Sequence, residues 1–191
     1  MRKYEFTEET KNYNGTILHR IKSLIYFGNV KSGEIGGWIE KEDNLCHYGD
    51  AWVSGDALVY DNACISGNAC IYGDARVYDN ARVYDNACIS GNAYISGDAR
   101  VFGNALVFGK KCVFWISSIG SRNGTTTFFN CADGKIRVAC GCFYGDLDEF
   151  AEAVNKTHGD NEHGQVYRLA IEMAKKRIHT VCNEVKRNDQ D

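Results

Sequence analysis

The sequence lacks the features that mark membrane, exported and generally nucleic-acid-binding proteins. No apolar run approaches the roughly 18–20 residues needed to span a bilayer. The opening stretch MRKYEFTEETKNYNGT has no apolar centre of the kind found in signal peptides. The net charge is −3, which argues against general nucleic-acid binding but still allows a local basic patch. We therefore expect a cytoplasmic protein without membrane association.

Proline is also absent, whereas glycine occurs 20 times and cysteine nine times. In the reducing compartment that the missing export signal implies, free thiols are the default, so we expect all nine cysteines to be reduced. A chain of 191 residues with 44% hydrophobic residues can bury the core of one domain with small appendages. The composition by itself points to no activity.

The middle of the chain repeats every six residues. From Gly49 to Phe108 it divides without a gap into the hexads GDAWVS, GDALVY, DNACIS, GNACIY, GDARVY, DNARVY, DNACIS, GNAYIS, GDARVF and GNALVF. In all of them position 5 is Val or Ile, position 3 is Ala and position 2 is Asp or Asn, while position 1 is Gly or Asp. DNLCHY (43–48) and GKKCVF (109–114) look like degenerate copies. A fixed short period of this kind indicates a solenoid.

Each position of the hexad has a physical role. Positions 4–6 favour a short strand, in which position 5 points inward and its two neighbours point outward. The Gly/Asp and Asp/Asn pair then turns the corner, because these residues tolerate positive φ. The Ala that follows the corner has to be small. Three strands complete a coil of a triangular prism, and about four coils at about 4.8 Å each give a length of roughly 19 Å.

This pattern resembles the hexapeptide left-handed parallel β-helix, over residues 43–114. We therefore predict a mainly β fold, a left-handed parallel β-helix of about four coils, with an N-terminal β cap (1–42) and a small C-terminal α+β module (115–191). In the cap we expect strands at 17–21 and 23–27 and turns at 28–29 and 36–37. In the module we expect two strands (125–130 and 135–140), helices at 146–156 and 165–186, and a frayed tail at 186–191.

Two longer stretches carry a second resemblance. LHRIKSLIYFGNVKSGEIGGWIEKEDNL (18–45) and VACGCFYGDLDEFAEAV (138–154) are similar to segments of uncharacterised bacteriophage and prophage proteins. The first of them also resembles the leader of putative hexapeptide acetyltransferases. The phage resemblance implies an accessory protein of the host bacterial cytoplasm. The same resemblance implies a role in counter-defence, by binding a host defence protein or by sequestering a nucleotide signal.

The alternative is an acyltransferase, and a third possibility is a purely structural protein. Hexapeptide acyltransferases use a loop that protrudes from one coil and a His that acts as general base between subunits. The ten hexads contain neither feature, and His47 lies only in the first degenerate hexad, at a position that should face inward. Position-4 cysteines such as Cys64, Cys70 and Cys88 are better interpreted as small outward side chains than as nucleophiles. We therefore expect no enzymatic activity and no cofactor.

A cysteine cluster in the C-terminal module is a weak candidate for a metal site. Cys131, Cys140 and Cys142 precede His158 and His163, and zinc accepts such mixtures of ligands. In a continuous strand Cys140 and Cys142 would point to the same face. The spacing differs from paired CxxC motifs, however, and buried structural thiols are the more common case. We therefore expect no metal.

Residues 18 apart stack on one face of such a prism, and many outward positions are aromatic or apolar. Exposed apolar surface usually marks an interface, although aromatic ladders that only stiffen the prism are the alternative. We expect a homo-oligomer, either a dimer or a trimer. The candidate interface residues are Trp52, Tyr72, Leu106, Phe108 and, in the C-terminal helix, Tyr167.

Three arginines are the only basic residues in the ten hexads. Two of them stack one coil apart beside aromatic side chains, where they could bind a nucleotide-like anion, because guanidinium pairs with phosphate and aromatic faces stack on bases. The alternative is that solvent, or Asp79 and Asp98, neutralises them. The candidate ligand-binding residues are Arg76, Arg82, Arg100, Tyr78, Tyr84 and Phe102.

Overall fold

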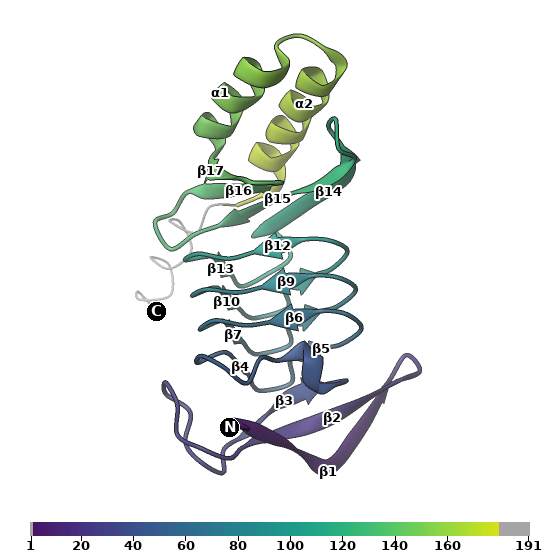
Figure 1. The fold of residues 1–191 in the computed structure, drawn as a ribbon, viewed down its shortest axis with the longest axis vertical. Coiled ribbons are helices and arrows are strands. Elements are labelled where there is room, and N and C mark those ends of the chain that lie inside the picture. The colour runs from purple at the N-terminus through teal and green to yellow at the C-terminus, as the bar shows by residue number, and fades with distance from the viewer. Residues whose placement is uncertain (1, 180–191) are drawn as a thin grey trace, which may run out of the picture.

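The computed structural model describes residues 2–179, which form a column of parallel β coils between an N-terminal cap and a C-terminal module (Figure 1). The fold is mainly β and contains a β-helix of about four turns, as the hexads predict. Among the described residues, no helix has both the length and the apolar character that crossing a bilayer requires.

Ten strands of two residues build the coils, and each pairs in parallel with a strand of an adjacent coil, as in Cys70↔Cys88 and Arg82↔Arg100. One face of the column is β4-β7-β10-β13 and another is β6-β9-β12. On the third face, β5-β8-β11 continue into the cap strands β3, β2 and β1. The strands are β4 Trp52–Val53, β5 Leu58–Val59, β6 Cys64–Ile65, β7 Cys70–Ile71, β8 Arg76–Val77, β9 Arg82–Val83, β10 Cys88–Ile89, β11 Tyr94–Ile95, β12 Arg100–Val101 and β13 Leu106–Val107.

The hexad positions have the predicted roles inside the coils. Every position-5 side chain from Val53 to Val107 is fully buried, and the position-3 alanines line the same core. Position 1 has a φ between 56° and 73° in all ten hexads, a region that Gly adopts freely and Asp tolerates. Position-2 amides form ladders along the corners, such as Asn62–Asn80–Asp98. The backbone conformation and the hydrogen bonds of the corners therefore recur from one coil to the next.

The tight inward space at position 3 gives a first prediction. Ala81 is fully buried, so Ala81→Leu should overpack the corner and lower the free energy of unfolding by about 1–3 kcal/mol. Chemical denaturation measures this change. Cys70→Leu is the matched control, because the same side chain at an exposed outward position should change stability by no more than about 0.5 kcal/mol. Equal effects of the two substitutions would contradict the assigned register.

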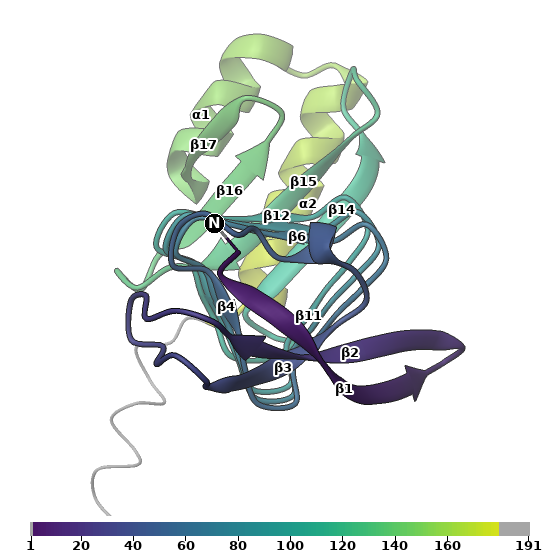
Figure 2. The same ribbon diagram turned by 60° about the horizontal axis from the view of Figure 1, so that its bottom comes forward.

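The cap consists of β1 (Tyr4–Tyr13), β2 (Thr16–Ser23), β3 (Ile35–Ile39) and the short 3-10 helix η1 (Glu42–Asn44). Residues 17–21 lie in a strand as predicted, but 24–27 do not continue one, and β1 is an additional strand. The turn predicted at 36–37 is wrong, because both glycines lie within β3. A Cβ at Gly36 would come within 2.5 Å of Ile21, so close packing requires glycine there. Figure 2 shows the β1–β2 hairpin projecting beyond the coils.

Buried polar side chains of the cap donate hydrogen bonds to backbone carbonyls at the N-terminal end of the β-helix. The ammonium group of Lys3 donates hydrogen bonds to the carbonyls of Gly49 (3.2 Å) and Ala51 (2.7 Å). The amide of Asn44 donates to the carbonyls of Asp61 and Ala63. Burial lowers the pKa of Lys3 to about 8. These contacts replace the hydrogen bonds that a preceding coil would supply.

The first degenerate hexad does not follow the predicted register. His47 does not point into the core; it is half-buried and stacks on Tyr4 with ring centroids 4.4 Å apart. Leu45 is fully buried in its place and forms a β-bridge with Ile65. An apolar side chain two residues earlier thus fills the inward position that a histidine would fill poorly.

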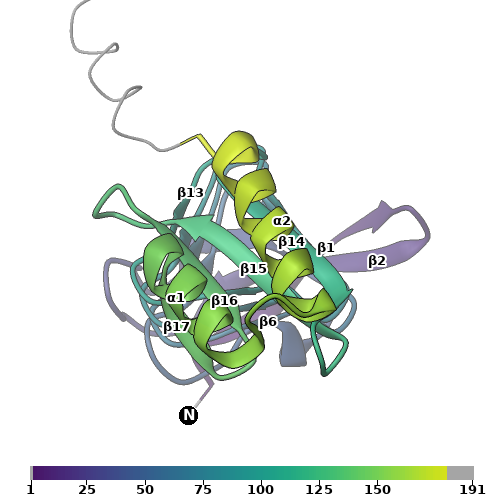
Figure 3. The same ribbon diagram turned by 90° about the horizontal axis from the view of Figure 1, so that it is seen from above.

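The C-terminal module has four strands, rather than the predicted two, in the order β14 (Val113–Ile119), β15 (Gly124–Asn130), β16 (Ile136–Cys140) and β17 (Phe143–Asp146). The helices α1 (Leu147–His158) and α2 (Glu162–Arg177) cover the sheet on the side away from the coils (Figures 1 and 3). The second helix ends at Arg177 because Ile178 is extended. The rest of its predicted span from residue 180, with the tail 186–191, lies outside the described residues.

Candidate anion-binding groove

A step in side-chain size along the β6-β9-β12 face creates a groove. In the coil of β6 the outward residues are Cys64 and Ser66, whereas the next coil carries Arg82 and Tyr84 at the same positions. The small residues form a floor and the large ones a wall. The resulting hollow has a volume of about 350 Å³, and its lining residues are Asn62, Cys64, Ser66, Arg82, Tyr84 and Arg100.

The two arginines of the groove carry uncompensated positive charge. Arg82 and Arg100 are directly paired on adjacent strands, so their Cα atoms lie about 4.8 Å apart. Within residues 2–179 neither forms an ion pair with a carboxylate, and the guanidinium of Arg100 donates a hydrogen bond to the carbonyl of Gly141 at 2.7 Å. Because the two side chains leave the backbone at this spacing, an anion between their guanidinium groups would be attracted to both of them.

The carboxylates that could have neutralised these arginines are engaged elsewhere. Asp79 accepts a hydrogen bond from the backbone N–H of Gly97 at 2.9 Å. Asp98 accepts one from the side-chain amide of Asn80 at 3.1 Å. Both acidic side chains therefore form hydrogen bonds at the corners of the coils. Within the described residues neither forms an ion pair with the arginines of the groove.

The aromatic side chains of this face are not equivalent. Tyr84 and Phe102 stack with centroids 4.7 Å apart and planes 5° apart, and Tyr144 packs against Phe102 at 4.6 Å. Phe102 is therefore in contact with two neighbouring rings, which argues against its predicted role as a surface for a base. Tyr84 lines the groove next to Ser66, and burial raises its pKa.

Arg76 and Tyr78 do not join this groove, because they belong to the face that carries the cap. The guanidinium of Arg76 lies 5.0 Å from the ring centroids of both Tyr13 and Tyr94, and it donates a hydrogen bond to the Tyr13 hydroxyl. Tyr78 stacks on Tyr60 at 5.1 Å. The predicted three-arginine site is thus reduced to two arginines.

The structure adds residues to the groove that the sequence interpretation did not include. Asn62 lines it, and the ammonium group of Lys41 donates a hydrogen bond to the Asn62 side chain at 3.2 Å. Lys41 belongs to the cap, so only the folded chain brings this third cation to the edge of the groove. The stacking of residues 18 apart could have identified Asn62, Cys64 and Ser66 as neighbours, but not Lys41.

Two of the predicted interface residues are buried within the chain and cannot serve as proposed. Trp52 is 5% exposed and packs against Phe27 and Tyr4, with centroids 5.5 and 6.4 Å away. Tyr167 is 8% exposed and packs on Phe150 in the core of the module. Of the other three, Tyr72 is 44% exposed, and Leu106 and Phe108 are half-buried.

The structure does not bring the three candidate metal ligands together. Cys140 pairs with Thr126, while Cys131 follows the far end of β15, about 17 Å away along the strand. Cys140 is the last residue of β16, whereas Cys142 lies in the two-residue turn that leads to β17, so the two are not in one strand. No group of three His, Cys, Asp or Glu side chains within residues 2–179 is placed to hold a metal ion. The eight cysteines in this range are free thiols, and Cys182 lies outside it.

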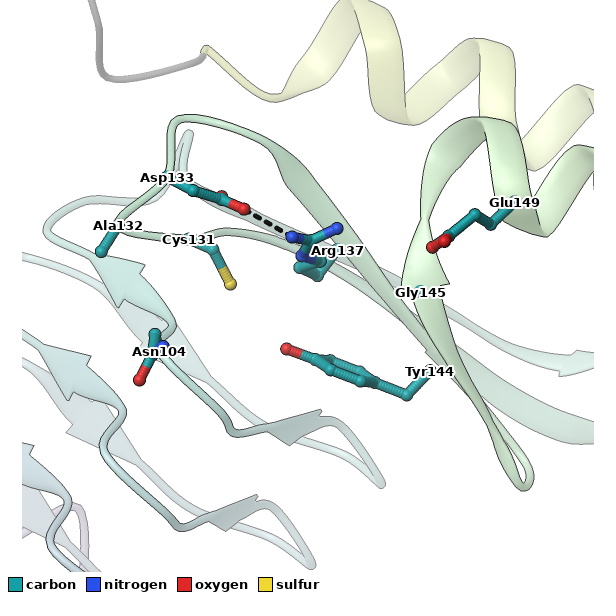
Figure 4. A pocket seen from close by; sticks show the side chains of 8 residues that line it. All are labelled: Asn104, Cys131, Ala132, Asp133, Arg137, Tyr144, Gly145 and Glu149. Carbon is teal, nitrogen blue, oxygen red and sulfur yellow. Dashed lines mark hydrogen bonds and ion pairs between the residues drawn. The ribbon is translucent and has the colours of Figure 1, made fainter.

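Cys131 lines a second hollow, of about 270 Å³, where the module meets the last coil (Figure 4). The positive charge in this hollow belongs to Arg137 and is already compensated, because Arg137 forms ion pairs with Asp133 and Asp146. Burial raises the pKa of the Cys131 thiol, which is therefore mostly protonated. This hollow lacks the free cations that distinguish the groove.

Comparison with known proteins supports the repeat architecture. A family model described as the YdcK beta solenoid repeat matches residues 69–84 and 75–91, within the coils that contain β7 to β10. Curated proteins gave no match to the chain. The matched stretch is similar to a β-solenoid repeat and shares its periodic fold, which by itself specifies no activity.

Proposed function

We propose that this chain is a non-enzymatic binding protein that holds a small phosphate-bearing anion in the groove of the β6-β9-β12 face. The observation that carries the proposal is the in-register pair Arg82 and Arg100, which has no carboxylate partner among residues 2–179 and adjoins an open hollow. A bound phosphate would relieve the repulsion between the two guanidinium groups and accept their hydrogen bonds in a bidentate manner.

The chemistry of the lining supports binding rather than catalysis. Guanidinium, amide and hydroxyl groups donate hydrogen bonds, but the six lining residues include no histidine or carboxylate that could take a proton. Burial raises the pKa of Cys64, which makes its thiol a poor nucleophile at neutral pH. The acyltransferase alternative would need a base that these six side chains do not supply.

The resemblance to phage and prophage proteins suggests how such binding would be used. We place the chain among accessory proteins that act in the bacterial cytoplasm against host defence. Sequestering a phosphorylated signal in the groove would be sufficient for this role, since no reaction is needed. In the second form of the same proposal the partner is a host protein, and this form becomes the favoured one if no anion binds.

Self-association is part of the proposal. Tyr72 is an exposed aromatic residue on the β4-β7-β10-β13 face, where Leu106 and Phe108 are also partly accessible. We expect a dimer or trimer that uses this face, and multi-angle light scattering at micromolar concentration measures it. Tyr72→Glu should shift the mass to that of a monomer. A monomeric wild type would remove the interface from the proposal.

Isothermal calorimetry with inorganic phosphate and pyrophosphate tests the proposed activity. We expect saturable binding at low ionic strength that weakens as salt is added, because screening reduces the attraction of exposed charges. Acetyl-CoA turnover, assayed in parallel, should be absent. If neither anion binds at low salt, the proposal fails, and the host-protein or purely structural alternative becomes the stronger one.

A further inference from the structure

The column of aromatic side chains beside the groove forms a ladder, with one ring per coil, that ends at Tyr84. Tyr84 stacks on Phe102 with centroids 4.7 Å apart, and Tyr144 packs against Phe102 in a tilted arrangement at 4.6 Å. The next position in register below Tyr84 is Ser66, because Ile65 pairs with Val83. Ser66 is too small to form a rung, so the ring of Tyr84 faces the hollow instead of another ring.

The dimensions of the vacant rung suit a planar ring. Adjacent coils are about 4.8 Å apart, which lies within the 4.5–7 Å range of centroid distances in aromatic pairs. A ring at the level of Ser66 would therefore stack on Tyr84 much as Tyr84 stacks on Phe102. The lateral position below Arg82 is likewise open, because the small side chain of Cys64 lies there.

The charged and aromatic parts of the groove are spaced along one strand. Arg82 and Tyr84 are two residues apart and point to the same side, so their side chains leave the backbone about 7 Å from each other. A ligand that uses both must carry a planar ring and a phosphate joined by a short linker. Nucleotides have this construction, with the sugar as the linker.

We infer that the groove takes a mononucleotide, whose base fills the vacant rung at Ser66 and whose phosphate meets Arg82 and Arg100. This inference rests on the proposed function and specifies its ligand. The base stacks on Tyr84 without base-specific hydrogen bonds, so the site tolerates different bases. The volume of about 350 Å³ lies at the low end for small-ligand sites, which fits one nucleotide rather than a longer strand.

A second ladder of aromatic side chains, on another face of the column, has a gap for a ring but, among the described residues, lacks the cationic part of the groove. On the β5-β8-β11 face Tyr60 stacks on Tyr78, and the following rung is again a serine, Ser96. The cation beside that ladder, Arg76, is already held between two tyrosine rings and bonded to Tyr13. That face therefore has a similar gap in its ladder, but the part of the chain that the structure describes places no free guanidinium beside it, which makes it an internal control.

Calorimetry with matched ligands and matched variants tests the inference. AMP and UMP should bind about tenfold or more tightly than ribose 5-phosphate, which differs from them by lacking a base. Ser66→Phe supplies the missing rung from the protein. It should reduce the affinity for AMP and UMP to that for ribose 5-phosphate and preserve the melting temperature. Ser96→Phe, the same change on the opposite face, should leave the advantage intact.

Tyr84→Leu is the second variant and guards against misfolding of Ser66→Phe. It should reduce the affinity for both nucleotides toward that for ribose 5-phosphate. If ribose 5-phosphate binds as tightly as the nucleotides, or if the advantage survives in Ser66→Phe and Tyr84→Leu, the nucleotide inference is overturned while anion binding stands. If none of the three ligands binds, the proposed function itself fails.

Discussion

We expect the change of Arg82 and Arg100 together to glutamate to lower the affinity for pyrophosphate at least 100-fold. Each guanidinium is expected to contribute charge-assisted hydrogen bonds worth about 1.5–3 kcal/mol, and glutamate replaces attraction by repulsion. The fold should persist, because Arg82 is exposed and Arg100 only half-buried. Calorimetry measures the affinity, and thermal unfolding monitors the fold.

The matched control for this variant reverses two charges away from the groove. Lys31 and Lys176 are exposed and lie in the cap and in α2. Lys31→Glu with Lys176→Glu produces the same change in net charge, so it should alter binding by less than about threefold through long-range effects. A double arginine variant that binds as well as wild type would show that the groove is not the site.

We expect the replacement of Trp52 with alanine to lower the free energy of unfolding by about 3–5 kcal/mol, the usual cost of truncating a buried Trp. Trp52 joins the cap to the first coil, because its indole packs against Phe27 and Tyr4. It also lies against β3, where a Cβ at Gly36 would come within 2.6 Å of its ring. Removing it leaves a cavity at the junction that the cap has to close.

Concentration dependence separates this role from that of an interface residue. If Trp52 supports the cap within one chain, the loss of stability should be the same at all protein concentrations. If it contributes to contact between subunits, the loss should change with concentration. Tyr72→Ala, on the same face but exposed, should cost much less. An equally small loss for Trp52→Ala would contradict the packing of the cap.

The coils could be predicted from sequence because every hexad position acts locally. Positive φ at position 1, a small residue at position 3 and an inward aliphatic residue at position 5 each follow from the backbone geometry of a single corner or strand. The same register identified Arg82, Arg100 and Tyr84 as neighbours. Stacking at a spacing of 18 residues is a fixed property of the coil, so it needs no knowledge of the rest of the chain.

The appendages could not be predicted in the same way, since their contacts depend on where distant segments lie. Trp52 points outward from its coil, and only the cap buries it. Arg76 is occupied because Tyr13 reaches it from the β1–β2 hairpin. Phe102 loses its second ring face to Tyr144 of the module. In each case the hexad gives the correct direction of the side chain but not its partner.

A crystal structure of the wild-type protein soaked with pyrophosphate at low salt tests the central claim most directly. The account predicts anion density in the groove, bonded to the guanidinium groups of Arg82 and Arg100, with Asn62 or Ser66 among the remaining donors. Density at another cationic position, such as Lys110 or Arg177, together with an empty groove would contradict it.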